Sequence, residues 1–276
     1  MFSASLFAAS GRAQPSRIKA GLRRALALGI EVGEVPPSAF SDSRNYLAGA
    51  DNVRLSSIEQ ALTDSTDLAW AVRGGYGMTR LAPFSSLPLT EKPALGFSDV
   101  TALLAAVHQA GGRAVHGPVL TSFAQADAAT EEALITAING GVRQWSLEGM
   151  CEPMSVPIVG GNLEVLTRLI GTSINPTYAG HMVVIEDIGE PWYRCDRSLT
   201  HLFAATDIGR AAAIVFGEFI DCEEGTVERL SKRIINLGIP CLTGAPVGHG
   251  PTNHAFVWGE RTSFSQGILT LSGALS

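Results

Sequence analysis

The sequence predicts an α/β protein built around mostly parallel β-sheet. Through the first half, short apolar runs alternate with amphipathic windows, the pattern typical of successive strand–helix units. The chain has 276 residues, which indicates two domains at roughly 150 residues each. With 46% hydrophobic and 17% charged residues, the composition excludes a disordered, collagen-like or coiled-coil protein.

The first strand is expected at Ser5–Ala9. The opening segment Met1–Ser10 has no basic stretch and its apolar run is short and interrupted, so it lacks the features of a secretory signal. The first helix follows Pro15 and is expected to stop at Gly29. Its apolar face carries Ile18, Leu22, Ala25 and Leu26.

The rest of the first half repeats this alternation. We expect Asp51 to cap a second helix, and Gly111 and Gly112 to end a third. The expected strands are Ile30–Val35, Leu68–Val72, Ala94–Phe97 and Ala114–Leu120. The helices have apolar faces at Leu55, Ile58 and Leu62, at Val100, Leu103, Leu104 and Val107, and at Leu134, Ile135 and Ile138.

Between Gly140 and Pro157 the periodicity gives way to Gly, Pro, Trp and polar residues, which is typical of a crossover between domains. We therefore expect an N-terminal domain at 1–142, a linker at 143–156 and a C-terminal domain at 157–276. The strands expected after the linker are Val156–Val159, Met182–Ile185, Ala212–Phe216, Cys241–Val247 and Ala255–Gly259. The helices expected there are Leu163–Ile170, Asp196–Thr206 and Val227–Leu237.

Charge and cysteine usage narrow the choice of partners. The net charge is −6 and no window is strongly basic, which argues against nucleic acid. The sequence contains no run of about 18 apolar residues, so we expect no membrane span. The cysteines show no C-x-x-C pair and no nearby histidine at metal-ligand spacing, so we expect reduced thiols in a cytoplasmic protein, with no metal site. They are Cys151, Cys195, Cys222 and Cys241.

Ser98 is the first candidate for chemistry. The apolar strand ends at Phe97 and a helix begins after Asp99, which places Ser98 on a strand-to-helix turn beside free backbone N–H groups. The geometry resembles a nucleophile elbow, although Val100 breaks the G-x-S-x-G pattern. A helix N-cap at Ser98–Asp99 explains the same residues.

A glycine-rich loop, Arg73–Gly77, follows the strand Leu68–Val72. It therefore lies at the carboxyl edge of the sheet, where α/β proteins bind ligands. Its glycines would let backbone N–H groups approach an anion, but neither nucleotide-binding fingerprint is present. A simple tight turn accounts for the loop equally well.

A serine nucleophile needs a base, and His249 is the best placed of the six histidines. It lies between Gly248 and Gly250, directly after an apolar run. The alternative is a hydrogen-bonded histidine with a purely structural role.

The base needs a carboxylate, and the apolar strand Met182–Ile185 ends in Glu186 and Asp187. Adjacent strand residues face opposite sides, so one of the two carboxylates is expected to face the histidine. The other would be solvated or would pair with Arg194 or Arg197. The pattern alone does not choose between them.

Taken in order, these segments resemble the LD-carboxypeptidase family, serine peptidases that include muramoyltetrapeptide carboxypeptidases and immunity peptidases against microcin-like peptide nucleotides. The likeness runs from about Ser5 to Gly259, and the ordered set of motifs is specific. Ala8–Ser10 stands where the family usually has Pro-Ser, and Met78 replaces a small residue. The matching motifs are Tyr46–Gly49 with Arg54, Arg73–Gly77 with Arg80–Leu81, Gly96–Leu103, His116–Pro118, Gly160–Leu163, Glu186–Asp187 with Tyr193 and Asp196–Arg197, and Gly248–His249.

The resemblance implies a Ser98–Glu186–His249 triad and an oxyanion hole from the backbone N–H groups of Asp99 and Gly75. It implies a Rossmann-like N-terminal domain and a swivelling C-terminal β/α domain, with the site at their junction. Arg73 is a candidate to bind the substrate's terminal carboxylate.

The function implied is a serine LD-carboxypeptidase that releases D-alanine from peptidoglycan-derived tetrapeptides through an acyl-enzyme. We expect a cytoplasmic homodimer that acts on a small peptide without cofactor or metal. An immunity peptidase acting on peptide nucleotides is the alternative within the family. A non-catalytic small-ligand-binding protein is the alternative outside it, and it would need neither Glu186 nor His249.

Overall fold

The computed structural model describes residues 2–41 and 46–275, and side chains up to residue 273. The chain divides into two compact units, Met1–Ala126 with Thr172–Ile174, and Asp127–Gly171 with Asn175–Ser276. Over the described ranges, no helix has both the length and the apolar character needed to cross a bilayer.

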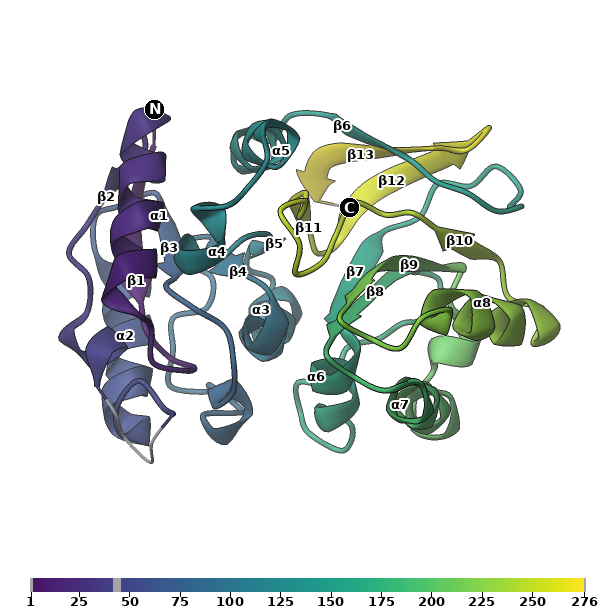
Figure 1. Ribbon diagram of the computed structural model, residues 1–276, viewed down its shortest axis with the longest axis horizontal. Coiled ribbons are helices and arrows are strands. Elements are labelled where there is room, and N and C mark those ends of the chain that lie inside the picture. The colour runs from purple at the N-terminus through teal and green to yellow at the C-terminus, as the bar shows by residue number, and fades with distance from the viewer. Residues whose placement is uncertain (1, 42–45, 276) are drawn as a thin grey trace. The chain divides into compact units, whose positions relative to one another are not determined.

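The first unit contains a parallel sheet in the order β5-β4-β3-β1-β2 (Figure 1). Every residue of β3, β4 and β5 is buried, which explains why these strands are continuous apolar runs in the sequence. Helix α2 packs on β1 and β3, and α3 packs on β4 and β5. The strands are β1 (Ser3–Phe7), β2 (Glu31–Val32), β3 (Leu68–Ala71), β4 (Ala94–Gly96) and β5 (Ala114–His116), and the helices are α1 (Pro15–Ala27), α2 (Asp51–Thr63), α3 (Thr101–Gln109) and α4 (Leu120–Phe123).

Two expectations for this unit are corrected. The strand predicted at Ala114–Leu120 ends at His116, because Pro118 has no N–H to donate to a ladder, and Leu120 begins α4. Asp51 is the first residue of α2 rather than its cap, and its carboxylate accepts hydrogen bonds from two guanidinium groups. These belong to Arg54 and Arg80.

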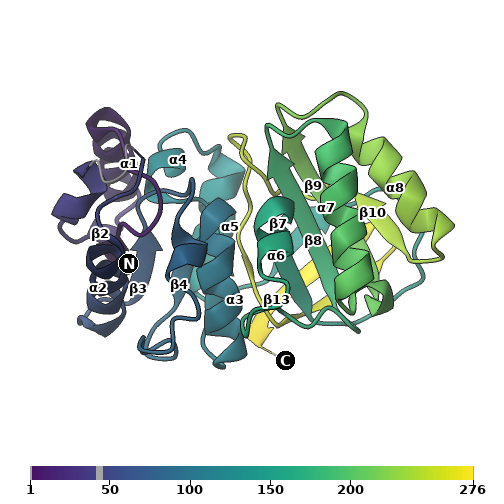
Figure 2. The same ribbon diagram turned by 90° about the horizontal axis from the view of Figure 1, so that it is seen from below.

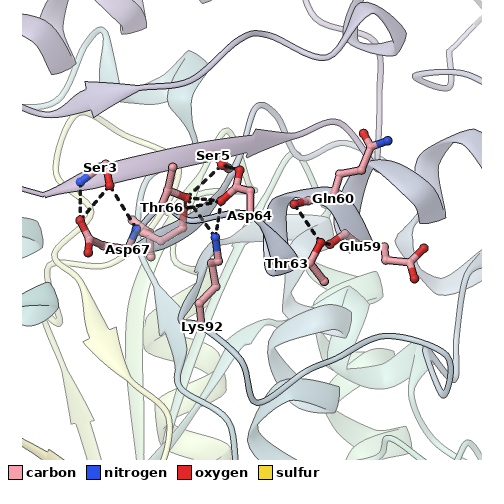
Figure 3. Close-up of polar contacts among 10 residues, drawn as sticks. Ser3, Ser5, Glu59, Gln60, Thr63, Asp64, Thr66, Asp67 and Lys92 are labelled. Carbon is pink, nitrogen blue, oxygen red and sulfur yellow. Dashed lines mark hydrogen bonds and ion pairs between the residues drawn. The ribbon is translucent and has the colours of Figure 1, made fainter.

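A polar cluster ties the segments that precede the strands of this sheet (Figure 3). Lys92, which precedes β4, donates to the Asp64 carboxylate and to the Thr66 hydroxyl, 3.0 Å away. The Ser5 hydroxyl on β1 also bonds to Asp64 and lies 2.9 Å from the Thr66 hydroxyl. Burial acts to raise the pKa of Asp64, but the Lys92 ammonium and the hydrogen bonds from Lys92 and Thr66 hold it below its ordinary value.

The second unit contains a parallel sheet in the order β10-β9-β8-β7. Helices α6, α7 and α8 lie along one face of this sheet (Figure 2). A Cβ on Gly160 of β7 would lie 2.0 Å from the Val184 carbonyl oxygen, so only glycine fits there. The strands are β7 (Ile158–Asn162), β8 (Met182–Ile188), β9 (Ala213–Ile220) and β10 (Cys241–Thr243), and the helices are α5 (Ala128–Ile138), α6 (Leu163–Arg168), α7 (Trp192–Ala205) and α8 (Thr226–Asn236).

An antiparallel sheet that the sequence did not predict packs in the same unit. Its strand order is β12-β13-β6. The strands are β12 (Glu260–Ser265), β13 (Ile268–Leu275) and β6 (Arg143–Ser146), and β11 (Phe256–Val257) precedes β12 in the chain. The expected linker at 143–156 therefore begins with a strand. Arg143 bonds to the Glu260 carboxylate, with both side chains buried, and this pair joins β6 to β12.

Candidate active site

Ser98 follows β4 and begins the short turn Ser98–Val100 that leads into α3. Its φ is 61°, in the left-handed region that residues other than glycine rarely adopt. Such a backbone costs on the order of 1–3 kcal/mol, and such outliers are found preferentially at active sites. The N-cap of this turn is Phe97 and that of α3 is Val100, and neither makes a side-chain cap bond, so the N-cap interpretation of Ser98–Asp99 is wrong.

The glycine-rich loop after β3 passes directly beside this serine. A Cβ on Gly74 would lie 3.0 Å from the Ser98 Cβ and 3.1 Å from its Oγ. Gly75 and Gly77 have φ values of 112° and 132°, which strongly favour glycine. The loop conformation and its approach to Ser98 therefore both depend on the missing side chains.

The orientation of the Gly75 N–H follows from the hydrogen bond that the preceding carbonyl, that of Gly74, accepts. The Gly11 N–H donates to the Gly74 carbonyl oxygen at 3.1 Å. In a trans peptide, the carbonyl and the following N–H point in opposite directions. The Gly75 N–H therefore points away from Gly11.

Two buried charged side chains hold this loop. The Asp99 carboxylate, in a residue only 2% exposed, accepts the Met78 N–H at 2.8 Å. Arg54, on α2, donates to the Gly77 carbonyl at 2.8 Å and to the Ala9 carbonyl. Burial raises the pKa of Asp99, while its hydrogen bonds act to lower it.

Neither role follows from the sequence pattern, which pointed only to the backbone of Asp99 and placed Arg54 in a motif without a role. The one available signal for Arg54 was its position three residues after Asp51 on a predicted helix, where the two side chains pair at 2.6 Å.

Arg73 lies at a cavity of about 500 Å³ in the same unit. Its guanidinium donates to the Arg12 carbonyl. Burial and the positive charges of Arg17 and Arg12 lower its pKa, which marks a locally cationic surface. The rings of Tyr46 and Tyr76 lie against each other, with centroids 5.8 Å apart. The cavity is lined by Gly11, Arg12, Tyr46, Arg73, Gly75 and Tyr76.

In the second unit, His249 and Glu186 form a buried pair. The His249 Nδ1 lies 2.8 Å from the Glu186 Oε2, and the two side chains are 13% and 0% exposed. A carboxylate accepts hydrogen bonds, so Nδ1 carries the proton and Nε2 is left as the basic nitrogen. Burial acts to lower the His249 pKa, but the charge and the hydrogen bond of Glu186 raise it above its ordinary value.

Asp187 differs from its expected environment. It is 3% exposed and is not solvated, and it pairs with neither arginine proposed for it. Its Oδ1 accepts from Asn162 Nδ2 at 2.9 Å and from its neighbour's backbone N–H at 2.8 Å. Burial and the adjacent charge of Glu186 raise its pKa to about 7. Within β8 the geometry selects Glu186 as the histidine's partner, a choice the sequence pattern left open.

Among the cysteines, the Cys195 and Cys222 thiols lie beside each other. The four cysteines are all free thiols. Over residues 2–41 and 46–275, no three His, Cys, Asp or Glu side chains are grouped so as to hold a metal ion.

A serine on a strained strand-to-helix turn and a carboxylate–imidazole pair are both typical of serine hydrolases. Comparisons with known proteins agree with this class. Residues 5–117 match the model of the LD-carboxypeptidase N-terminal domain, and residues 155–264 match that of the LD-carboxypeptidase C-terminal domain. A murein tetrapeptide carboxypeptidase of Pseudomonas aeruginosa is 33% identical over 240 residues, which cover 78% of each protein. The chain belongs to the LD-carboxypeptidase family of serine peptidases.

Solved structures show the same fold. A muramoyltetrapeptide carboxypeptidase from Oxalobacter formigenes matches with a TM-score of 0.85 at 24% identity, covering 99% of this chain and all of that one. The microcin C7 self-immunity protein MccF matches with a TM-score of 0.87 at 20% identity, covering 100% of this chain and 97% of that one. The α/β fold class predicted from the sequence is thereby confirmed.

Proposed function

We propose that this protein is a serine LD-carboxypeptidase that removes the terminal D-alanine of peptidoglycan-derived tetrapeptides. The observation that carries the proposal is the buried hydrogen bond between Glu186 and His249. A protein that only bound an anion with its glycine loop and helix terminus would need neither side chain. The Pseudomonas relative, a murein tetrapeptide carboxypeptidase, supports the choice of substrate.

In the proposed reaction, the Ser98 hydroxyl attacks the carbonyl carbon of the terminal amide. His249 accepts the serine proton at Nε2 and passes it to the leaving amine of D-alanine. Glu186 keeps Nδ1 protonated and stabilises the imidazolium that forms. A water molecule, deprotonated by the same nitrogen, then hydrolyses the acyl-enzyme and releases the tripeptide.

We propose that the backbone N–H groups of Gly75 and Asp99 stabilise the oxyanion. Two observations support the assignment of Gly75. The Gly75 N–H points away from its neighbour Gly11, and its loop lies against Ser98. Preorganised donors of this kind typically contribute about 100- to 1000-fold in rate each.

Arg73 is proposed to bind the terminal carboxylate of the peptide. The side chain borders a cavity that also contains Gly75, and Arg12 and Arg17 add positive charge nearby. A guanidinium can hold a carboxylate with two hydrogen bonds, which would explain why a free C-terminus is required.

A serine-directed fluorophosphonate probe tests the nucleophile. The parent should be labelled at Ser98, and Ser98→Ala should not be labelled. A purely binding protein would leave both unlabelled. Purified protein should then be assayed on a tetrapeptide, a pentapeptide and a peptide adenylate. We expect turnover of the tetrapeptide, whereas selective turnover of the adenylate would indicate an immunity peptidase.

We further propose that the protein acts in the cytoplasm as a homodimer. The four free thiols fit a reducing compartment. Light scattering coupled to size exclusion should give twice the 29.0 kDa chain mass. A single-chain mass at micromolar concentration would contradict the dimer.

A further inference from the structure

The loop that carries His249 packs against the second half of strand β9. The Glu218 N–H donates to the Val247 carbonyl at 2.8 Å, and the Ala245 N–H donates to the Phe216 carbonyl at 3.3 Å. A Cβ on Gly217 would lie 2.3 Å from the Val247 carbonyl oxygen. The approach is therefore as close as a glycine allows.

The Glu218 side chain lies against both glycines that flank His249. A Cβ on Gly248 would lie 2.6 Å from the Glu218 Cβ, and a Cβ on Gly250 would lie 2.7 Å from its Oε2. The Gly250 backbone lies beside the Glu218 carboxylate and acts to lower its pKa, although the Oε2 atom has no hydrogen-bond partner among the described residues. Both glycines that flank His249 are thus explained by one glutamate, which contacts the loop on each side of the imidazole.

We propose that Glu218 is a positioning residue for His249. The Glu218 carboxylate anchors the Gly248–Gly250 loop and places a further negative charge beside the imidazole. The role of this position rests on the proposed function of His249 as the base. Glu186 orients the ring through Nδ1, whereas Glu218 acts on the backbone that carries the ring.

The charges around His249 predict the direction of the electrostatic effect. Glu186 and Asp187 on β8 and Glu218 on β9 each act to raise the His249 pKa. Burial raises the pKa of Glu218 itself, and the charges of Asp127 and Glu186 add to that rise. Removing the Glu218 charge should therefore lower the His249 pKa.

Two variants separate the charge from the anchor. Glu218→Gln keeps the side-chain volume that contacts both glycines but removes the charge, whereas Glu218→Ala removes the side chain beyond Cβ. For Glu218→Gln we expect the His249 pKa to fall by about half a unit, with kcat at high pH within about threefold of the parent. For Glu218→Ala we expect kcat to fall on the order of tenfold, with little change in KM, because the imidazole is less well placed.

The His249 pKa is measured by NMR titration of the imidazole signals, assigned with His249→Ala, and the acidic limb of kcat/KM is measured alongside. Glu228→Gln is the matched control, because that carboxylate is exposed and pairs with Lys232. An unchanged His249 pKa in Glu218→Gln would overturn the electrostatic part, even if the Ala variant failed to fold. Parent-like kcat in a folded Glu218→Ala would overturn the anchor.

The titration does not depend on turnover, so failure of the proposed function is distinguishable. A parent that cleaves no peptide, with a normal pKa shift in Glu218→Gln, would reject the peptidase and keep the contact between Glu218 and the His249 loop.

Discussion

Ser98 combines a reactive side chain with a strained backbone, and substitutions separate the two. Ser98→Ala should lose on the order of 10³- to 10⁶-fold in kcat while the fold is kept. Ser98→Gly should be equally inactive but about 1 kcal/mol more stable than Ser98→Ala, because glycine adopts a φ of 61° without steric cost. The checks are turnover and chemical denaturation. Ala turnover within about tenfold of the parent would remove Ser98 as nucleophile.

Glu186 and Asp187 are neighbours in sequence with different partners. Glu186→Gln should reduce kcat far more than Asp187→Asn, because only Glu186 bonds to the imidazole and stabilises its charged form. Both variants are assayed on the same tetrapeptide near pH 8. The reverse order of effects would assign the triad carboxylate to Asp187.

Asp187 also predicts a dependence of stability on pH. Its pKa is about 7 in the folded chain, above the value of 3.8 expected when unfolded. Between these values the unfolded chain loses its proton first, so the carboxyl destabilises the fold increasingly as pH rises and fully above pH ~7. Asp187→Asn should therefore match the parent near pH 3.5 and be more stable at pH 8 by on the order of 2–4 kcal/mol. Urea denaturation at both pH values measures this, and equal stability at pH 8 would contradict it.

At the scale of elements, the loop after β3 lies close to the turn after β4, and we expect kcat to depend on this close approach. Gly74→Ala would push a methyl group to about 3 Å from the Ser98 side chain, and we expect a loss of kcat on the order of tenfold or more with the fold retained. Gly209→Ala is the matched control, since its Cβ would meet nothing closer than 3.9 Å. Equal kcat in the two variants would show that the approach of this loop does not matter for chemistry.

For the molecule as a whole, kcat/KM should rise with pH, because His249 must be neutral to accept the serine proton. Burial acts to lower the His249 pKa, but Glu186 raises it by more than burial lowers it. The acidic limb of kcat/KM should therefore lie above the ordinary value of 6.5. The profile should be unaffected by a chelator. His249→Ala should lose this limb together with most activity. Chelator-sensitive turnover, or an unchanged limb in that variant, would contradict the mechanism.

Local patterns in the sequence were enough to predict the strands of the parallel sheets. Strands such as β3 and β8 are buried along nearly their whole length, so they appear as apolar runs, and helices such as α8, with Leu230 and Ile234 buried one turn apart, show the helical period. Strands β6, β12 and β13 were missed. In β6 and β12, buried and exposed residues alternate over only a few positions, and β6 pairs with β13, which lies more than 100 residues later in the chain.

The sequence by itself determined the fold class, and the order of its motifs indicated Ser98, Glu186 and His249 as candidates for catalysis. Tertiary structure alone decided the φ of Ser98, the geometry of the buried contact between Glu186 and His249, and the contacts of Arg54 and Glu218. The physical reason is that periodicity reports which face of an element is buried. Hydrogen bonds between elements depend instead on where distant segments meet, and no local pattern encodes that.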